Sequence, residues 1–424
     1  MRKQENILQG TDWITIAIYA TLVLLGWANI FASVYDESLN QSMFDLSLNS
    51  GRQLMFILVS IVLIIGIMVV DLRFFEAVAW VMYAVIMILV FLVPFIGKEV
   101  GGNKAWIGIG SFGGQPSEFA KFATALVAAR YISSPLFKMD NLRQQATAFG
   151  IILLPMALIL LQKDWGTALV FSVFLLVFYR EGMSPILLLT GAGAAVIFLL
   201  TLLVPQHLYL HLGVAAVFAV IILMGKKKIR RILALTASAL LIMGLIQSAD
   251  YVLTKVLKPH QQNRIKALIN PDADPLGFGW NVTQSKIAIG SGGFFGKGFL
   301  KGTQTKFDFV PEQDTDFIFC TIGEEQGWVG SLFVIGLFCG LFLRLLFLAE
   351  RQKNRFSRVY IYGVVCILFF HFAVNIGMTI GLFPVIGIPL PFFSYGGSSL
   401  MGFTILLFIA VKLDAHRGQV LQRI

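Results

Sequence analysis

Apolar stretches alternate with short polar segments along almost the whole chain. About twelve of them approach the roughly 20 mostly apolar residues that a membrane-spanning helix needs. They begin near Trp13, Leu54, Phe75, Glu118, Ala146, Thr167, Ile186, Leu208, Ile232, Thr315, Tyr360 and Gly397. The fourth, sixth and eighth stretches are short or polar. The pattern therefore allows roughly 10–12 spans, and we favour a count of about 12. It predicts an all-α polytopic membrane protein with one integral membrane domain, residues 1–424.

Composition favours a membrane protein over a soluble one. Of the 424 residues, 57% are hydrophobic and only 13% are Asp, Glu, Lys or Arg. That charged share is about half the share in a soluble domain, which could not bury so much apolar surface. The cysteines form no CxxC pair and no cluster with histidines, so neither a disulfide framework nor a zinc site is predicted.

The distribution of Lys and Arg orients the chain. Net charge is +10, and basic residues gather in the cytoplasmic loops of membrane proteins. If both termini are cytoplasmic, every inner segment is basic. The inner residues are Arg2, Lys3, Arg73, Arg130, Lys138, Arg143, Arg180, Lys226, Lys227, Lys228, Arg230, Arg231, Arg351, Lys353, Arg355, Arg358, Lys412, Arg417 and Arg423. This charge predicts attraction to membrane lipids, and the lack of a basic soluble domain predicts no nucleic-acid binding.

One large extracytoplasmic loop, residues 250–314, departs from this rule because it is also rich in Lys and Arg. Long loops are partly exempt from the rule, which is one explanation. An anionic partner at the outer membrane surface, such as a diphosphate, is the other. Glycines recur between residues 290 and 302, and they let backbone N–H groups turn toward an anion. A flexible loop with turn glycines gives the same pattern.

Ionisable residues in or beside predicted spans are candidates for function, because charge in lipid is costly. Glu118 and Lys121 lie three residues apart on one helix face and can form an ion pair, either structural or catalytic. Asp164 is expected to be a helix N-cap. Glu325 lies at the edge of a span and is harder to explain structurally. His371 fits a hydrogen-bonded core residue better than a ligand.

Asp274 precedes a proline in the long loop, between basic and apolar residues near the predicted membrane surface. Partial burial would raise the pKa of this carboxyl toward the working pH, which suits a general base. An Asp-Pro turn is the structural alternative, and the residues alone do not decide between them.

Several motifs together resemble the SEDS family, the proteins of shape, elongation, division and sporulation. The matching segments are residues 115–121, 164–168, 274–279, 284–285, 288–293, 302–304, 311–312, 315–319, 324–325, 375–378, 387–391 and 394–398. The resemblance runs from about Trp13 to His416. Segment 302–304 is more similar to the rod-elongation branch than to the division branch.

The resemblance implies a transmembrane helical bundle in the bacterial inner (cytoplasmic) membrane, with an active site that faces the periplasm or outside. It implies a peptidoglycan glycosyltransferase that polymerises lipid II for cell-wall elongation and cell shape. A class B penicillin-binding protein, a transpeptidase, is the implied partner. Catalysis is assigned to Asp274, with Asp164 as a second acid. Substrate-binding or electrostatic roles are assigned to Lys121, Glu118, Arg264, Gln284, Ser285, Lys286, Ser291, Thr303 and Glu325.

In the expected mechanism Asp274 takes the proton of the acceptor hydroxyl, and Lys121, Arg264 and Lys286 stabilise the departing diphosphate. Glu118 holds Lys121 in place. No cofactor is predicted, although a divalent cation, Mg or Mn, could share the electrostatic task. A lipid II flippase and a non-catalytic scaffold for a transpeptidase are the rival functions. The residues suited to chemistry cluster on the outer side, which favours the enzyme.

The sequence departs from the family pattern at three places. Lys163 stands where the family has a proline before Asp164, so the turn geometry can differ. Lys104 and Ala105 precede Trp106 where the family has paired arginines, which leaves one positive charge. The family usually has ten spans, and segment 186–247 could hold an extra helix pair.

Overall fold

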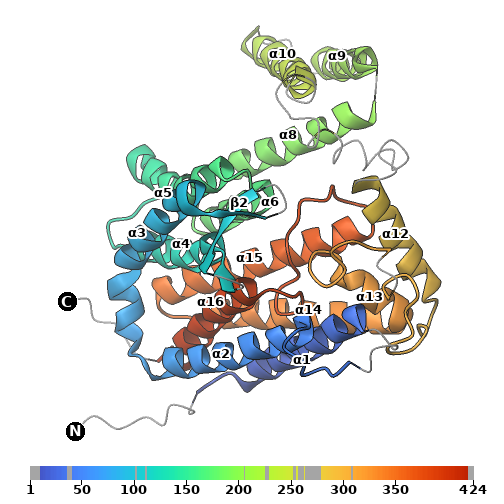
Figure 1. Ribbon diagram of the computed structural model, residues 1–424. Helices are drawn as coiled ribbons and strands as arrows, with labels where there is room; N and C mark the ends of the chain where they lie inside the picture. The colour runs from blue at the N-terminus through green and yellow to red at the C-terminus, as the bar shows by residue number, and fades with distance from the viewer. Residues whose placement is uncertain are drawn as a thin grey trace. The chain divides into compact units, whose positions relative to one another are not determined.

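The computed structural model describes residues 10–35, 41–100, 103–109, 112–204, 206–224, 229–251, 255, 262, 278–306 and 309–418, which are mainly helical. Every apolar stretch predicted from the sequence contains a helix that begins within two turns of its expected start (Figure 1). The helices before residue 183 are α1 Trp13–Val34, α2 Asn49–Val69, α3 Leu72–Ile96, α4 Pro116–Ile132, α5 Leu142–Leu161, α6 Trp165–Val170, the 3₁₀ turn η2 Phe171–Val173 and α7 Phe174–Arg180. Those after residue 277 are α12 Phe278–Ser291, α13 Ile318–Glu325, α14 Gly327–Glu350, α15 Arg355–Thr379 and α16 Gly397–Ala415.

Contacts divide the chain into two compact units. The first comprises Met1–Gly182 and Asn281–Ile424, and the second comprises Met183–Trp280. The second unit holds helices α8 Pro185–Leu203, α9 His207–Met224 and α10 Ile229–Tyr251, which pack on one another. The sequence analysis expected one domain, and the unit that separates from it contains the segment suspected of holding an extra helix pair.

Eight helices among the described residues are long and apolar enough to cross a membrane: α1, α2, α3, α5, α9, α14, α15 and α16. Shorter apolar helical segments occur at Trp165–Arg180, Pro185–Ala194 and Leu235–Ser248. The number of crossings and the cytoplasmic placement of both termini stay predictions.

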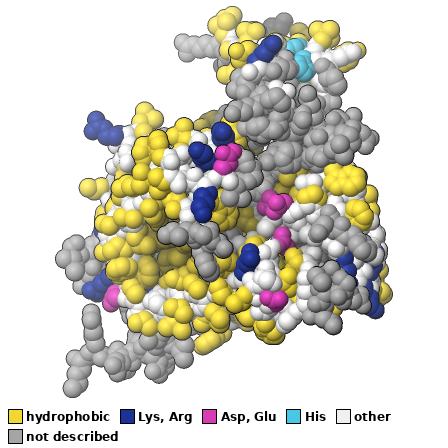
Figure 2. All heavy atoms as spheres, in the orientation of Figure 1, with side chains coloured by type: hydrophobic (Ala, Val, Ile, Leu, Met, Phe, Trp, Pro, Cys, Tyr) yellow, Lys and Arg dark blue, Asp and Glu magenta, His cyan; other side chains and the backbone are white. Residues whose placement is uncertain are grey.

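Hydrophobic side chains cover much of the surface of the first unit over α2 and α3 (Figure 2). Val62 and Ile65 of α2 and Val81 and Ile88 of α3 are each more than half exposed. An aqueous solvent would penalise such a surface, whereas lipid tails are as apolar as these side chains. The outer surface of these helices is therefore suited to lipid.

Helices α4, α15 and α16 form the interior of the first unit. Helix α4 carries alanines on several sides, and small residues let neighbouring helices approach closely. At Gly402 of α16 a Cβ atom would lie 3.1 Å from the backbone oxygen of Glu118. This close crossing brings the start of α4, where the candidate site residues lie, against α16.

A three-stranded antiparallel sheet precedes α4, in order β1 Lys98–Val100, β2 Asn103–Ile109 and β3 Phe112–Gly114. Lys98 pairs with Trp106, and Ile107 pairs with Gly114. The all-α expectation missed this sheet, because strands of 3 to 7 residues give almost no periodic signal. The last strand leads directly into Gln115 and α4.

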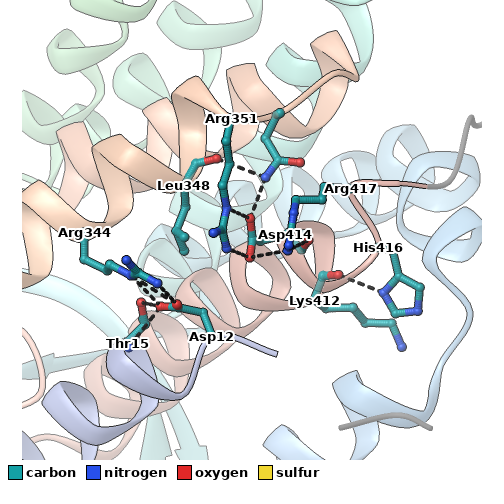
Figure 3. A network of polar contacts seen from close by, with 10 residues as sticks. Asp12, Thr15, Arg344, Leu348, Arg351, Lys412, Asp414, His416 and Arg417 are labelled. Carbon is teal, nitrogen blue, oxygen red and sulfur yellow. Dashed lines mark hydrogen bonds and ion pairs between the residues drawn. The ribbon is translucent and has the colours of Figure 1, made fainter. Parts of the chain in front are cut away.

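Ion pairs join the ends of α1, α14 and α16 (Figure 3). Arg344 Nε lies 3.0 Å from the Asp12 carboxylate at the start of α1. Arg351 Nε and Gln352 Nε2 donate to Asp414 Oδ1 at 2.7 and 2.8 Å, and Asp414 is fully buried. These charge-assisted bonds fix one end of the helical bundle.

Candidate functional site

The first turn of α4 places an ion pair inside the protein. Pro116 occupies the first turn, where its missing N–H costs nothing, and Glu118 follows where the positive end of the helix dipole favours an acid. Lys121 Nζ lies 2.8 Å from both carboxylate oxygens of Glu118. Only 2% of the Lys121 side chain and 3% of that of Glu118 are exposed. The predicted pairing is confirmed.

The Lys121 ammonium has a third acceptor in His371 of α15, whose Nε2 atom lies 3.0 Å away. The ring of Phe403 on α16 faces the same ammonium at 4.4 Å. An ammonium group has three N–H donors, and here three acceptor atoms surround it. Lys121 therefore has no spare donor for a ligand in this arrangement.

Asp164 connects two helices through a tight turn. Its side chain accepts from Thr167 N at 3.0 Å and caps α6, as predicted. Its own N–H reaches back to Ile159 O, which closes the end of α5. Lys163 between them has φ 64°, a left-handed conformation that proline cannot adopt. The departure from the family proline at this position thus corresponds to a turn that excludes proline.

Hydrogen bonds connect Asp164 to the start of α4. Gln115 Nε2 donates to Asp164 Oδ2 at 2.9 Å, and Gln115 N donates to Ser398 Oγ of α16 at 3.0 Å. We call the set Gln115, Glu118, Lys121, Asp164 and His371 the buried polar cluster. Its single cation interacts with both carboxylates, Glu118 and Asp164. The cluster therefore offers little net positive charge to an anionic substrate.

Helix α12 carries four predicted substrate-binding residues, and the three consecutive ones have different surroundings. Ser285 is fully buried, and its hydroxyl donates to Thr379 O at 2.9 Å, so it holds α12 against the end of α15. Gln284 is buried. Lys286 is exposed, with its stem near Gly381, and no ion pair of Lys286 is found within the described ranges. Of the predicted cations that the structure describes, Lys286 is the more available to a ligand.

One predicted residue, Thr303, contacts Glu324 and not the buried polar cluster. Glu324 Oε1 accepts from Lys297 Nζ at 2.6 Å, from Thr303 N at 2.7 Å and from Gln304 N at 2.9 Å. Its Oε2 atom accepts from Thr305 N at 3.0 Å. Although burial alone would raise the pKa of this carboxyl, the bonds from Lys297 and the backbone lower it to about 2. Thr303 is thus used in holding its own loop.

Glu325 has the opposite environment to its neighbour. It is 1% exposed, its Oε1 accepts from Gly302 N at a long 3.4 Å, and its buried Oε2 has no partner among the described residues. Burial raises the pKa of Glu325 to about 7. Ser291, also predicted to bind substrate, donates to Ala288 O within its own helix. Asp274 and Arg264 lie outside the described residues.

Comparison with known proteins places this architecture in a family. A family model for cell cycle proteins, covering FtsW, RodA and SpoVE, matches residues 12–212 and 186–419. The chain belongs to this family. Peptidoglycan glycosyltransferase RodA of Treponema pallidum is 34% identical over 96% of this chain and 98% of its own. Peptidoglycan glycosyltransferase MrdB of Escherichia coli K12 is 34% identical over 81% and 80%. Stage V sporulation protein E of Bacillus subtilis is 31% identical over 96% and 97%.

Solved structures have the same fold. A structure of a peptidoglycan synthase complex that coordinates polymerization and crosslinking contains a chain with a TM-score of 0.69 and 25% identity, covering 97% of this chain and 99% of that one. The rod shape determining protein RodA of Thermus thermophilus has a TM-score of 0.63 and 23% identity, covering 98% and 100%. The resemblance to the SEDS proteins and the multi-pass helical fold are therefore confirmed.

For this FtsW/RodA/SpoVE family member, sequence reasoning missed several residues that complete the site. It interpreted His371 as a core residue only, and it did not select Gln115 or Asn375. The available signal was the spacing of His371 and Asn375, one helical turn apart on an otherwise apolar helix. Across the described ranges no three His, Cys, Asp or Glu side chains group as a metal site would require. The described carboxylates therefore do not fit the optional divalent cation.

Proposed function

We propose that this protein is a peptidoglycan glycosyltransferase of the bacterial inner membrane, which polymerises lipid II for cell-wall elongation and cell shape. The observation that carries the proposal is its 34% identity to peptidoglycan glycosyltransferase RodA over nearly the full length of both chains. The fold shared with a peptidoglycan synthase complex supports the same reading. The active site in this proposal faces the periplasm or outside.

In the proposed reaction, the acceptor hydroxyl attacks the anomeric carbon of a lipid-linked donor while the lipid diphosphate leaves. Asp274 takes the hydroxyl proton. The donor linkage is α and the product linkage is β, so one displacement with inversion is the simplest course. Lys286 and Arg264 stabilise the negative charge of the departing diphosphate. Lys121, whose donors are occupied, acts from inside the protein by keeping the start of α4 in place.

A class B penicillin-binding protein is the proposed partner. The support is the fold shared with a chain of a complex that joins polymerization to crosslinking. Crosslinking requires a transpeptidase active site, which the family motifs in this chain do not supply. Membrane lipids are the second proposed contact, because the chain carries a net charge of +10 and wide apolar surfaces.

The test is polymerisation of labelled lipid II by the purified protein, alone and with its transpeptidase, followed on a gel. Wild type is compared with Asp274→Asn, and folding of both is checked by melting temperature. We expect glycan chains from wild type and a loss of about 100- to 10,000-fold in rate for the variant. Equal activity would remove Asp274 as the base. If neither wild type nor Asp274→Asn forms chains even with the partner, the result favours the flippase and scaffold functions. Lipid translocation in vesicles is then measured.

A further inference from the structure

The atoms around His371 show which of its two ring nitrogens carries a proton. Its Nδ1 atom lies 3.2 Å from Pro389 O, and its Nε2 atom lies 3.0 Å from Lys121 Nζ. A carbonyl oxygen can only accept, so Nδ1 carries the proton. Nε2 is then a lone-pair acceptor, which suits an ammonium donor. The ring is a neutral imidazole that connects a backbone carbonyl to Lys121.

The third acceptor, His371, is needed to hold the Lys121 ammonium in one position. Its stem has four flexible carbons, and the Glu118 carboxylate occupies two of its three N–H donors. His371 occupies the third. The rings of His371 and Phe403 meet edge to face at 4.8 Å, and Phe403 also faces the ammonium. The imidazole thus fixes both the direction and the surroundings of the cation.

The same imidazole connects the ion pair to segment 386–391. Asn375, one turn further along α15, donates to Ile388 O at 2.9 Å and to Asp316 O at 2.9 Å. On the other side of the segment, a Cβ atom at Gly166 of α6 would lie 2.4 Å from Ile386 O. Segment 386–391 is therefore connected to α4 in two ways. One connection runs through α6 and Asp164, and the other runs through His371 and Lys121.

We propose that His371 is a positioning residue for glycan polymerisation: as a neutral acceptor it holds Lys121 and thereby keeps the start of α4 in register with segment 386–391. The inference rests on the proposed function and adds a residue to which that function assigns no role. Without the His371 acceptor, one N–H of Lys121 has no partner, and only Glu118 holds the ammonium. The ammonium can then shift from its position. A displacement of about 1 Å in a catalytic arrangement can cost roughly 100-fold in rate.

Two substitutions separate positioning from simple packing. His371→Phe keeps a ring against Phe403 but removes the acceptor, and His371→Gln keeps an acceptor oxygen. Phe369→Leu, a change at a half-exposed position of the same helix, is the matched control. Each variant is purified with the transpeptidase, and kcat and KM for labelled lipid II are measured beside the melting temperature. We expect His371→Phe to lower kcat about 10- to 100-fold with KM nearly unchanged, and His371→Gln to recover most of it.

Three results would overturn the proposal. Full activity in His371→Phe would show that the acceptor is dispensable. If His371→Phe and His371→Gln lose activity to the same extent, and both also lower the melting temperature to the same extent, the residue is purely structural. A lower KM with unchanged kcat in His371→Phe would mean that His371 only keeps Lys121 away from substrate.

If wild type itself makes no glycan, the proposed function fails separately. The His371 variants are then compared by hydrogen exchange of residues 115–122 at the start of α4, measured by mass spectrometry in detergent. Faster exchange in His371→Phe that His371→Gln restores would support the positioning role. Identical exchange in wild type and both variants would overturn it.

Discussion

Replacing Glu324 with glutamine should open segment 297–306 while the helices around it stay folded. The two carboxylate oxygens accept from Lys297 and from the backbone N–H groups of Thr303, Gln304 and Thr305. An amide retains one acceptor oxygen and places an NH₂ group against the buried N–H of Thr305. One unsatisfied buried donor costs about 1–3 kcal/mol, and weaker bonds to the remaining donors add to it. We take about 3 kcal/mol as the total, which is roughly a 100-fold change in the opening equilibrium.

The assay is hydrogen exchange of a peptide spanning residues 297–306, measured by mass spectrometry in detergent. Local opening exposes these amides without global unfolding, so the loss of protection should be confined to this segment. Glu325→Gln is the matched control, because it makes the same chemical change at the next residue. Glu325 Oε1 accepts a long 3.4 Å bond from Gly302 N, and its Oε2 atom has no partner among the described residues. Its replacement should leave exchange of Thr303 to Thr305 unchanged.

Two results would refute this role of Glu324. One is exchange of Glu324→Gln within a few-fold of wild type, and the other is equal opening of the segment in both glutamine variants. The first result would mean that the loop is held by its other contacts. The second would mean that negative charge at the end of α13, rather than the set of hydrogen bonds to Glu324, stabilises the loop. Either outcome would also remove the structural role assigned to Thr303.

Three further predictions concern stability, measured as melting temperature in detergent. The pKa of Glu325 is raised from 4.5 to about 7, so the native protein holds this proton more tightly; the stabilisation is complete below pH 4.5 and lost as pH rises through 7. The loss is at most about 3 kcal/mol, and Glu325→Gln should abolish this pH dependence. Lys163→Gly should stabilise by about 1 kcal/mol and Lys163→Pro should destabilise by about 3 kcal/mol or more. Asp414→Asn should cost about 2–3 kcal/mol, because the hydrogen bonds from Arg351 lose their charged acceptor.

The sequence was sufficient for features that depend on neighbouring residues. Glu118 and Lys121 are three residues apart on a helix, so their pairing follows from helix geometry. The capping role of Asp164 follows from its place before an apolar helix. The bond between His371 and Lys121 joins residues 250 positions apart, and no local pattern encodes it. The sequence also identifies a charge at Lys121 without revealing that every donor of that ammonium is occupied.

The occupied donors of Lys121 change where positive charge for a diphosphate should be sought. A buried cation is stable only when its donors and its charge are matched, and Lys121 achieves this with Glu118 and His371. The same bonds that stabilise the Lys121 ammonium inside the protein leave it without a free donor for an anionic ligand. Lys286 has the reverse properties: it is exposed on α12, and no carboxylate among the described residues pairs with it. The proposed function therefore assigns the electrostatic attraction of an anionic lipid to Lys286 and the alignment of the helices to Lys121.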